Sequence, residues 1–480
     1  MHAKVHPQIT VLSGEQRAQV HEHSLRILSS VGVRVDGERA RRAFARAVPA
    51  GASLDGDRVR IPRELIEWAL RVAPSAVDVY DRRGNLAFRL GDGGETRFGI
   101  GVTALYYQEP EDDQVVPFAR AHMARMVRLG SALSAFDVLS TVGVVQDVDP
   151  RASDLYAALE MVANTARPLV LLVSDAACFP AVLDMLEGLC GDMAAHPFVL
   201  PYVNPITPLV LNEGTVDKMW ATVERGLPLI FSSYGMAGAT APIVPAGALV
   251  LLNAELLAGL ALSQLIRAGA PVVLGSLPAF FDMRSMGSFY DVTSYLLNLA
   301  CAEMMAHYRL PHCGTSGSGI GWGADLIAAA HQWANHLTSC MGRVGLAPFV
   351  GNTLGDKAVS PALLVYADWV IAQARRLARG FSLCDAEVAV DEIGQVGPGG
   401  DFLTAQTTLA RFREARYASD LFPNLTLEEW QGQGRPRAMD RLRSHTRQLL
   451  AELDAPADHD DLIASGESFI RAWANRFRQD

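Results

Sequence analysis

The feature that most constrains the fold is an alternation of short apolar runs with helical spans in the middle of the chain. We expect eight of these runs to be β-strands, and from the second onward a span of helical composition separates each from the next. The runs lie at residues 98–107, 138–145, 169–174, 198–203, 229–232, 272–275, 312–314 and 349–351. Strict alternation builds a parallel sheet and eight strands close it, so the sequence predicts an α/β fold, a (β/α)8 TIM barrel.

The regions on either side of this alternation are predicted to be helical. Residues 1–95 contain a helix start at Ser13 and a proline that precedes a third helix at Pro62, followed by a hairpin near residues 78–90. We therefore expect an N-terminal helical subdomain at 1–95, the barrel at 96–360, and a C-terminal helical extension at 361–480 that packs on the barrel.

Composition excludes several classes of protein. The net charge of −10, without a basic cluster, makes nucleic acid an unsuitable partner. The most apolar run, residues 246–262, contains Asn253 and Glu255, which favours a buried helix over a membrane span. The six cysteines form no Cys-x-x-Cys pair, a usage typical of reduced cytosolic proteins. We therefore expect a cytoplasmic enzyme with no contact to membranes.

Aromatic residues are frequent where the expected strands end, and the C-terminal ends of barrel strands are where active sites form. A quaternary ammonium ion has no N–H to donate, so it is held by the faces of aromatic rings together with negative charge. Ordinary core packing accounts for any single ring as well as a cation site does, but it accounts less well for all of the rings together. The candidate rings for such a cation site are Tyr106, Tyr107, Tyr234, Phe281 and Trp322.

Polar residues at the same strand ends complete the candidate site. Prolines fix the backbone around Asn204 and Thr207. We expect these two side chains either to contact the substrate or to cap a turn. Asp282 and Arg284 either pair with each other, or they contact the substrate. In the second case Asp282 faces the cation or Arg284 binds a substrate carboxylate. The remaining candidates for substrate contact are Ser316, Asp325 and Asn352.

Glycine-bearing loops suggest where a cofactor binds. Gly238 follows the fifth expected strand, and Gly317 and Gly319 follow the seventh, where many barrels cradle phosphate. This second loop lacks the lysine of a P-loop, so a phosphate or flavin site and a simple flexible connection both remain open. His331 and His336 do not have the spacing of a helical metal site, and we expect no metal. No nucleophile elbow is present, and no catalytic side chain is assigned.

Several ordered segments carry a resemblance to a known family. They are Leu12-Ser13, Arg60-Ile61-Pro62, Asn204-Pro205, Gly238 to Pro242, Asn253-Ala254-Glu255, Asp282-Met283-Arg284 and Val396 to Gly400. With them the chain resembles the trimethylamine methyltransferase family, in the branch without pyrrolysine that includes glycine betaine and other quaternary-amine methyltransferases. The resemblance implies a (β/α)8 barrel that moves a methyl group from an amine to the cobalt of a corrinoid (cobalamin) on a separate protein.

The chemistry implied by this resemblance needs few reactive side chains. Reduced cobalt is a strong nucleophile and a quaternary ammonium releases a neutral amine, so the enzyme supplies orientation and desolvation. We therefore predict a homo-oligomeric methyltransferase that takes a small, betaine-like quaternary amine, meets a corrinoid protein and binds no cofactor tightly. Two alternatives stay open: a barrel enzyme with a phosphate-bearing cofactor at the Gly317 loop, and a non-catalytic barrel that binds quaternary amines.

Overall fold

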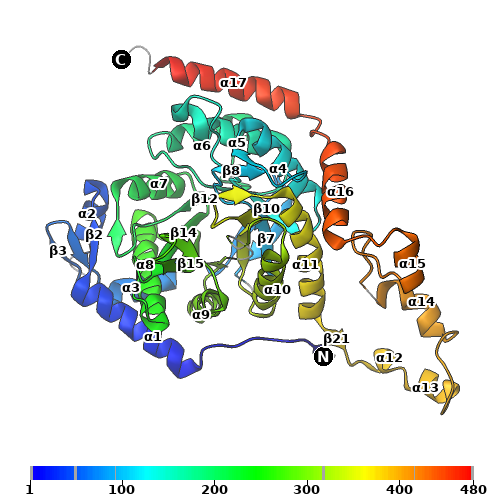
Figure 1. The fold of residues 1–480 in the computed structure, drawn as a ribbon. Helices are drawn as coiled ribbons and strands as arrows, with labels where there is room; N and C mark the ends of the chain where they lie inside the picture. The colour runs from blue at the N-terminus through cyan, green and yellow to red at the C-terminus, as the bar shows by residue number, and fades with distance from the viewer. Residues whose placement is uncertain are drawn as a thin grey trace.

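The computed structural model contains a closed barrel of eight parallel strands, as the sequence predicted (Figure 1). The structure describes residues 4–47, 51–91, 93–315, 319, 321–415 and 417–476. Each strand pairs with the one that follows it in the barrel, and β18 closes the ring against β7. The barrel strands are β7 (Arg97–Ile100), β10 (Phe136–Ser140), β11 (Leu169–Leu171), β12 (Val199–Val203), β14 (Leu229–Ala237), β15 (Val272–Asp282), β17 (His312–Cys313) and β18 (Leu346–Val350).

One helix follows each barrel strand and covers the outside of the ring. α8 is long and apolar enough to cross a membrane, but most of it is buried among its neighbours, so it is read as a core helix. All six cysteines are free thiols. The helices are α4 (Arg120–Ala132), α5 (Ser153–Asn164), α6 (Phe179–Cys190), α7 (Glu213–Glu224), α8 (Pro245–Ile266), α9 (Val292–Tyr308), α10 (Leu326–Met341) and α11 (Pro361–Arg379).

The first barrel strand is shorter than expected. It ends at Ile100, and the chain then leaves the barrel for a separate four-stranded sheet in which Tyr106 and Tyr107 lie. The positive φ of Gly101, +89°, lets the backbone turn away close to Val142. The strands of this side sheet are β8 (Tyr106–Gln108), β9 (Val115–Pro117), β19 (Asn352–Thr353) and β20 (Ala358–Val359).

The N-terminal segment covers one side of the barrel and closes its base. A reciprocal pair of hydrogen bonds between Ser13 and Gln16 caps α1. The hairpin of β5 and β6 buries Val79 and Phe88 among the side chains that fill the barrel interior. The elements are α1 (Gly14–Arg26), a π-helical turn (Ile27–Val31), β2 (Val33–Val35), α2 (Glu38–Ala45), β3 (Ser53–Asp55), β4 (Arg58–Arg60), α3 (Arg63–Val72), β5 (Val77–Tyr80) and β6 (Leu86–Leu90). β2 also pairs with the short β13 (Val210–Leu211).

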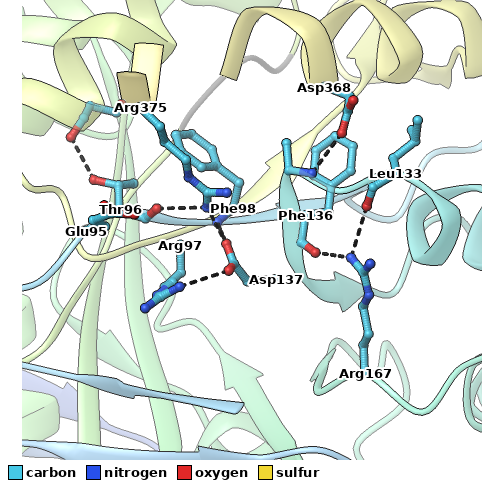
Figure 2. A network of polar contacts seen from close by, with 12 residues as sticks. Glu95, Thr96, Arg97, Phe98, Leu133, Phe136, Asp137, Arg167, Asp368 and Arg375 are labelled. Carbon is cyan, nitrogen blue, oxygen red and sulfur yellow. Dashed lines mark hydrogen bonds and ion pairs between the residues drawn. The ribbon is translucent and has the colours of Figure 1, made fainter. Parts of the chain in front are cut away.

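A polar network ties together the N-terminal ends of β7 and β10 at this base (Figure 2). The Asp137 carboxylate pairs with Arg97 (Nη1 to Oδ1, 3.1 Å) and with Arg375 of α11. It also accepts a hydrogen bond from the backbone N–H of Phe98 at 2.9 Å. Arg167 donates to the Phe136 carbonyl beside it. These contacts join the first two strands to the last helix of the ring.

The C-terminal segment leaves the barrel and then returns to it. α12 to α15 lie to one side of the ring, whereas α17 lies along α5 and α6 (Figure 1). The link begins where β21 (Phe381–Ser382) pairs with β1 (Lys4–Val5). The helices are α12 (Asp385–Val388), α13 (Val390–Val396), α14 (Gln406–Ala415), α15 (Leu427–Gly432), α16 (Ala438–Ala451) and α17 (His459–Arg476).

Candidate functional site

A cavity of about 530 Å³ opens at the C-terminal ends of the barrel strands. This is the end at which (β/α)8 barrels build their sites, and the volume suits a small organic ligand. Its lining residues are Val102, Thr103, Leu172, Tyr202, Asn204, Pro205, Ile206, Thr207, Tyr234, Met236, Thr240, Leu277, Ser288, Tyr290, Thr315, Phe349 and Asp356.

Four aromatic rings stand in the cavity wall: Tyr202, Tyr234, Tyr290 and Phe349. Tyr202 and Phe349 come from strands on different sides of the ring, and they meet edge to face with centroids 5.1 Å apart. Both are almost fully buried, as is Tyr290. The wall therefore offers π-faces and edges held rigidly by the barrel core.

Two neighbouring strands, β14 and β15, extend beyond the barrel beside this wall. β14 and β15 stay paired as far as Ala237 and Phe280, and the chain then turns back as β16 (Gly287–Phe289). Asp282 stabilises the turn, because its carboxylate accepts hydrogen bonds from the N–H of Arg284 at 3.0 Å and the hydroxyl of Ser285 at 2.7 Å. The N–H of Arg284 is the main cause of the lowered pKa of Asp282. The returning strand brings Ser288 and Tyr290 to the cavity.

The Asp356 carboxylate lies beside the two tyrosines of this extension. The Tyr290 hydroxyl is hydrogen-bonded with Tyr234 and with Asp356. Burial, and then the charge of Asp356, raise the pKa of Tyr290 far above its usual range. Burial is also the main cause of the raised pKa of Tyr234, which is hydrogen-bonded with Ser288. Both phenols therefore stay protonated at neutral pH.

Gly319 packs directly behind this carboxylate. A Cβ added at Gly319 would lie 3.0 Å from both Asp356 carboxylate oxygens and 3.0 Å from the Tyr290 ring, at a backbone φ of +82°. The glycine is needed so that Asp356 and Tyr290 can approach. A phosphate at this glycine would face a carboxylate, which disfavours the phosphate-cofactor interpretation of the loop. Ser316 and Gly317 lie outside the described residues.

A buried carboxylate on α8 supports the loop after β12. Glu255 is 2% exposed and accepts hydrogen bonds from the Thr207 hydroxyl at 2.9 Å and the Leu209 N–H at 2.5 Å, and it also bonds the Ser233 hydroxyl. Burial raises the pKa of Glu255, although these hydrogen bonds oppose the shift. Asn204 is fixed by donating to the Ser232 carbonyl at 2.8 Å.

Of the candidates from sequence, the structure places Asn204, Thr207 and Tyr234 in the cavity wall. Asn352 lies behind the wall, where its amide donates to the Val102 carbonyl at 2.8 Å. Gly238 forms the turn after β14, with a φ of +96° and an N–H that donates to the Ala241 carbonyl at 2.9 Å.

The other candidates lie away from the cavity. Tyr106 is 38% exposed on β8, whereas Tyr107 is buried and stacked on His122, and burial raises its pKa to about 12. Trp322 is 72% exposed. Asp325 caps α10 by accepting from the N–H of Trp322 at 2.7 Å and of Ala328 at 2.8 Å. Phe281, Asp282 and Arg284 belong to the β15–β16 extension and do not line the cavity either.

Among the wall residues that sequence reasoning missed are three of the rings, Tyr202, Tyr290 and Phe349, and the Asp356 carboxylate. Tyr202 and Phe349 lie inside predicted strands, where side-chain alternation assigns a face only when the register is known. Asp356 follows the last strand and was available as a strand-end carboxylate. Among the described residues, no group of three or more His, Cys, Asp or Glu is arranged to hold a metal ion.

Comparison with known proteins agrees with this architecture. The chain matches the family model described as trimethylamine methyltransferase (MTTB) over residues 2–474. It is 26% identical to the glycine betaine methyltransferase of Desulfitobacterium hafniense (strain Y51) over 475 residues, which is 97% of each chain. It is 26% identical to the proline betaine:corrinoid methyltransferase of Eubacterium limosum, over 84% of this chain and 85% of that one.

Among solved structures, the monomethylamine methyltransferase of Methanosarcina barkeri superposes with a TM-score of 0.54 at 10% identity. The match covers 94% of this chain and 89% of that one. At this identity the likeness supports the barrel fold and carries no assignment of substrate.

Proposed function

Because the chain belongs to the trimethylamine methyltransferase family and is a methyltransferase, we propose that it moves a methyl group from a small quaternary amine to the cobalt of a corrinoid carried by a separate protein. Two relatives are named for betaines and one of these also for a corrinoid. The observation that carries the proposal is the cavity itself, in which four aromatic rings and the Asp356 carboxylate meet at the barrel mouth.

The wall suits a cation that offers no hydrogen-bond donor. Ring faces attract a quaternary ammonium through their quadrupole, with about 0.5–2 kcal/mol for each well-placed ring. Asp356 adds a longer-range attraction, and Tyr290 holds its carboxylate in place. The same wall gives a neutral amine less binding energy, because a neutral nitrogen has no charge for rings or carboxylate to attract.

Methyl transfer then requires orientation more than proton transfer. The reduced cobalt supplies the electron pair that forms the new bond to carbon. As the C–N bond breaks, its electrons stay on nitrogen, and a neutral tertiary amine leaves without a proton. Buried rings on β12 and β18 and the apolar Leu172 and Leu277 keep water from the reacting methyl group. The chain contributes a dry, rigid cavity that aims one methyl group outward.

The rim of the cavity supports docking of the corrinoid protein. Met283 and Met286 at the tip of the β15–β16 extension are 73% and 72% exposed, and Ile206 is also exposed beside the opening. Exposed apolar side chains next to a functional opening are typical of protein contact sites. We place the partner on this rim, because its corrin must reach a methyl group inside the cavity.

A paired experiment tests the rim. Met283→Asp with Met286→Asp is expected to raise the KM for the corrinoid protein at least about tenfold, since charges in a protein contact cost several kcal/mol. Quaternary-amine binding to the same variant stays unchanged. Leu86→Asp on β6, which is also an exposed apolar position but lies at the base of the barrel, is the control. An unchanged KM in the double variant would remove the partner from this rim.

The outlying helices support self-association. Leu403, Leu409 and Phe412 are exposed on the segment that stands to one side of the barrel (Figure 1). We propose that a second copy of the chain covers this segment, in an enzyme of the cytoplasm. Size-exclusion chromatography with light scattering tests this: the native chain elutes as an oligomer, and Leu403→Asp with Phe412→Asp shifts it to the monomer. A monomeric native chain would contradict the proposal.

The function itself is tested by binding and by turnover. We expect one or more quaternary amines to raise the melting temperature of the protein, and the same compounds to be demethylated when a reduced corrinoid protein is supplied. Binding without methyl transfer to any supplied corrinoid protein would favour a non-catalytic amine-binding barrel. No shift with any methylated amine would overturn the assignment.

A further inference from the structure

We propose that the site prefers quaternary ammonium compounds with a net positive charge over zwitterions that carry a carboxylate close to the nitrogen. This inference rests on the proposed function and narrows its substrate class. Two relatives are named for zwitterionic betaines, so the proposal sets this chain apart from the substrates in those names. It follows from the charges that line the cavity.

The described lining has one charged side chain, that of Asp356, and contains no arginine, lysine or histidine. The four positions of the neighbouring loop that lie outside the described residues are Ser316, Gly317, Ser318 and Ile320. None of these four residue types is charged. The described lining therefore offers one carboxylate and no basic side chain.

The nearest candidates for binding a carboxylate lie elsewhere. Arg284, which the sequence suggested for this role, is exposed in the turn after β15 and does not line the cavity. Lys357 follows Asp356 directly, but its side chain is exposed and does not line the cavity. A bound betaine would have only hydroxyl and amide groups, such as those of Thr103 and Asn204, for its carboxylate.

Hydroxyl and amide donors do not neutralise the charge of the carboxylate that a betaine would bring into the cavity beside Asp356. A carboxylate moved out of water is stabilised by an ion pair or by several hydrogen bonds, and a like charge nearby raises the cost further. Asp356 is hydrogen-bonded with Tyr290 at the wall, and an incoming anion would meet its carboxylate there. Asp356 instead attracts a ligand of net charge +1 throughout its entry into the cavity.

The charge of the product next to Asp356 favours the same class of substrate. Demethylation of a monocation leaves a neutral amine, so the attraction to Asp356 disappears with the reaction. Demethylation of a zwitterion leaves an anion next to Asp356. The geometry thus fits a substrate whose charge changes from +1 to zero.

The test uses two ligands of matched size, choline and glycine betaine, measured by calorimetry on the full-length protein. We expect choline to bind on the order of tenfold or more tightly, because juxtaposed like charges cost several kcal/mol. Asp356→Asn should bring the two dissociation constants close together, mainly by weakening choline. Asp112→Asn, at an exposed position of the β8–β9 turn, should leave their ratio unchanged.

A second variant keeps the test decisive if Asp356→Asn fails to fold. Ile206→Arg adds a guanidinium at the exposed edge of the cavity and should improve betaine binding relative to choline. Equal or tighter binding of betaine by the native protein would overturn this inference while leaving the proposed function intact. Failure of every quaternary amine to bind would instead overturn the proposed function.

Discussion

The two ends of the barrel use charge in opposite ways. At the base, Asp137 is paired with Arg97 and Arg375, so its charge is compensated within the chain. At the mouth, the described cavity lining carries Asp356 and contains no basic side chain. The base uses its charges to hold strands and helices together, whereas the cation that we propose for the mouth would meet a described lining without basic side chains. Substitutions at the two ends should therefore affect different properties.

The largest expected effect is at the base. Asp137→Ala removes the shared partner of two arginines, and the side chains of Asp137 and Arg375 are both largely buried. Loss of one member of a buried ion pair costs about 3–5 kcal/mol because the other charge is left uncompensated. Urea unfolding should show this loss, while the folded fraction keeps its affinity for quaternary amines.

The matched control is an exposed pair on the hairpin that fills the base. Asp78 pairs with Arg89 at 3.2 Å on the surface, and Asp78→Ala should cost at most about 1 kcal/mol. Equal losses of stability in Asp137→Ala and Asp78→Ala would mean that the network at the base does not stabilise the fold.

The second effect is a pH dependence of stability. Burial lowers the pKa of His336 to about 3 and that of His312 to about 4. Both remain neutral in the folded chain while the unfolded chain takes up protons below pH 6.5, so stability is present above that pH and is lost as pH falls. Between pH 7 and pH 5 the free energy of unfolding should fall by about 2 kcal/mol per histidine.

Denaturant titrations at pH 7 and pH 5 measure this loss. His336→Gln should reduce the difference in the free energy of unfolding between pH 7 and pH 5, because the glutamine amide does not titrate. This holds whether or not the substitution changes stability at pH 7. A native chain as stable at pH 5 as at pH 7 would contradict the burial argument.

The third effect is at the mouth and concerns binding. Tyr234→Leu removes one ring from the cavity wall and should raise the dissociation constant of a quaternary amine about tenfold, or about 1.4 kcal/mol. Tyr234→Phe keeps the ring and should change it by less than about threefold. Equal losses in both variants would assign the effect to the hydroxyl and not to the ring.

The fold was largely predictable because it depends on a repeated pattern. Eight apolar runs in alternation with helices identify the barrel even when single strand boundaries are wrong, since the count of strands fixes closure. The error at the first strand has a local cause. Gly101 turns the backbone out of the barrel, and the apolar residues after it belong to a side sheet of the same composition.

The site was less predictable because a cavity depends on which face each side chain takes. Asn204, Thr207 and Tyr234 were found because they follow apolar runs at residues 198–203 and 229–232, which the sequence shows directly. Tyr290 reaches the wall only through the turn after β15 and the returning β16, a contact between segments that no local pattern records. Asp282 and Arg284 were expected either to pair locally or to contact substrate, and they occupy the turn that makes this return possible.

The smallest expected effect separates a wall residue from an exposed ring. Trp322 is an aromatic residue beside three glycines, yet it lies outside the cavity and faces solvent next to Leu326. Trp322→Ala should therefore leave the dissociation constant of quaternary amines unchanged, within about twofold, in the same calorimetric measurement as Tyr234→Leu. A tenfold loss would mean that the loop closes over the cavity when ligand binds, and Trp322 would then belong to the mouth after all.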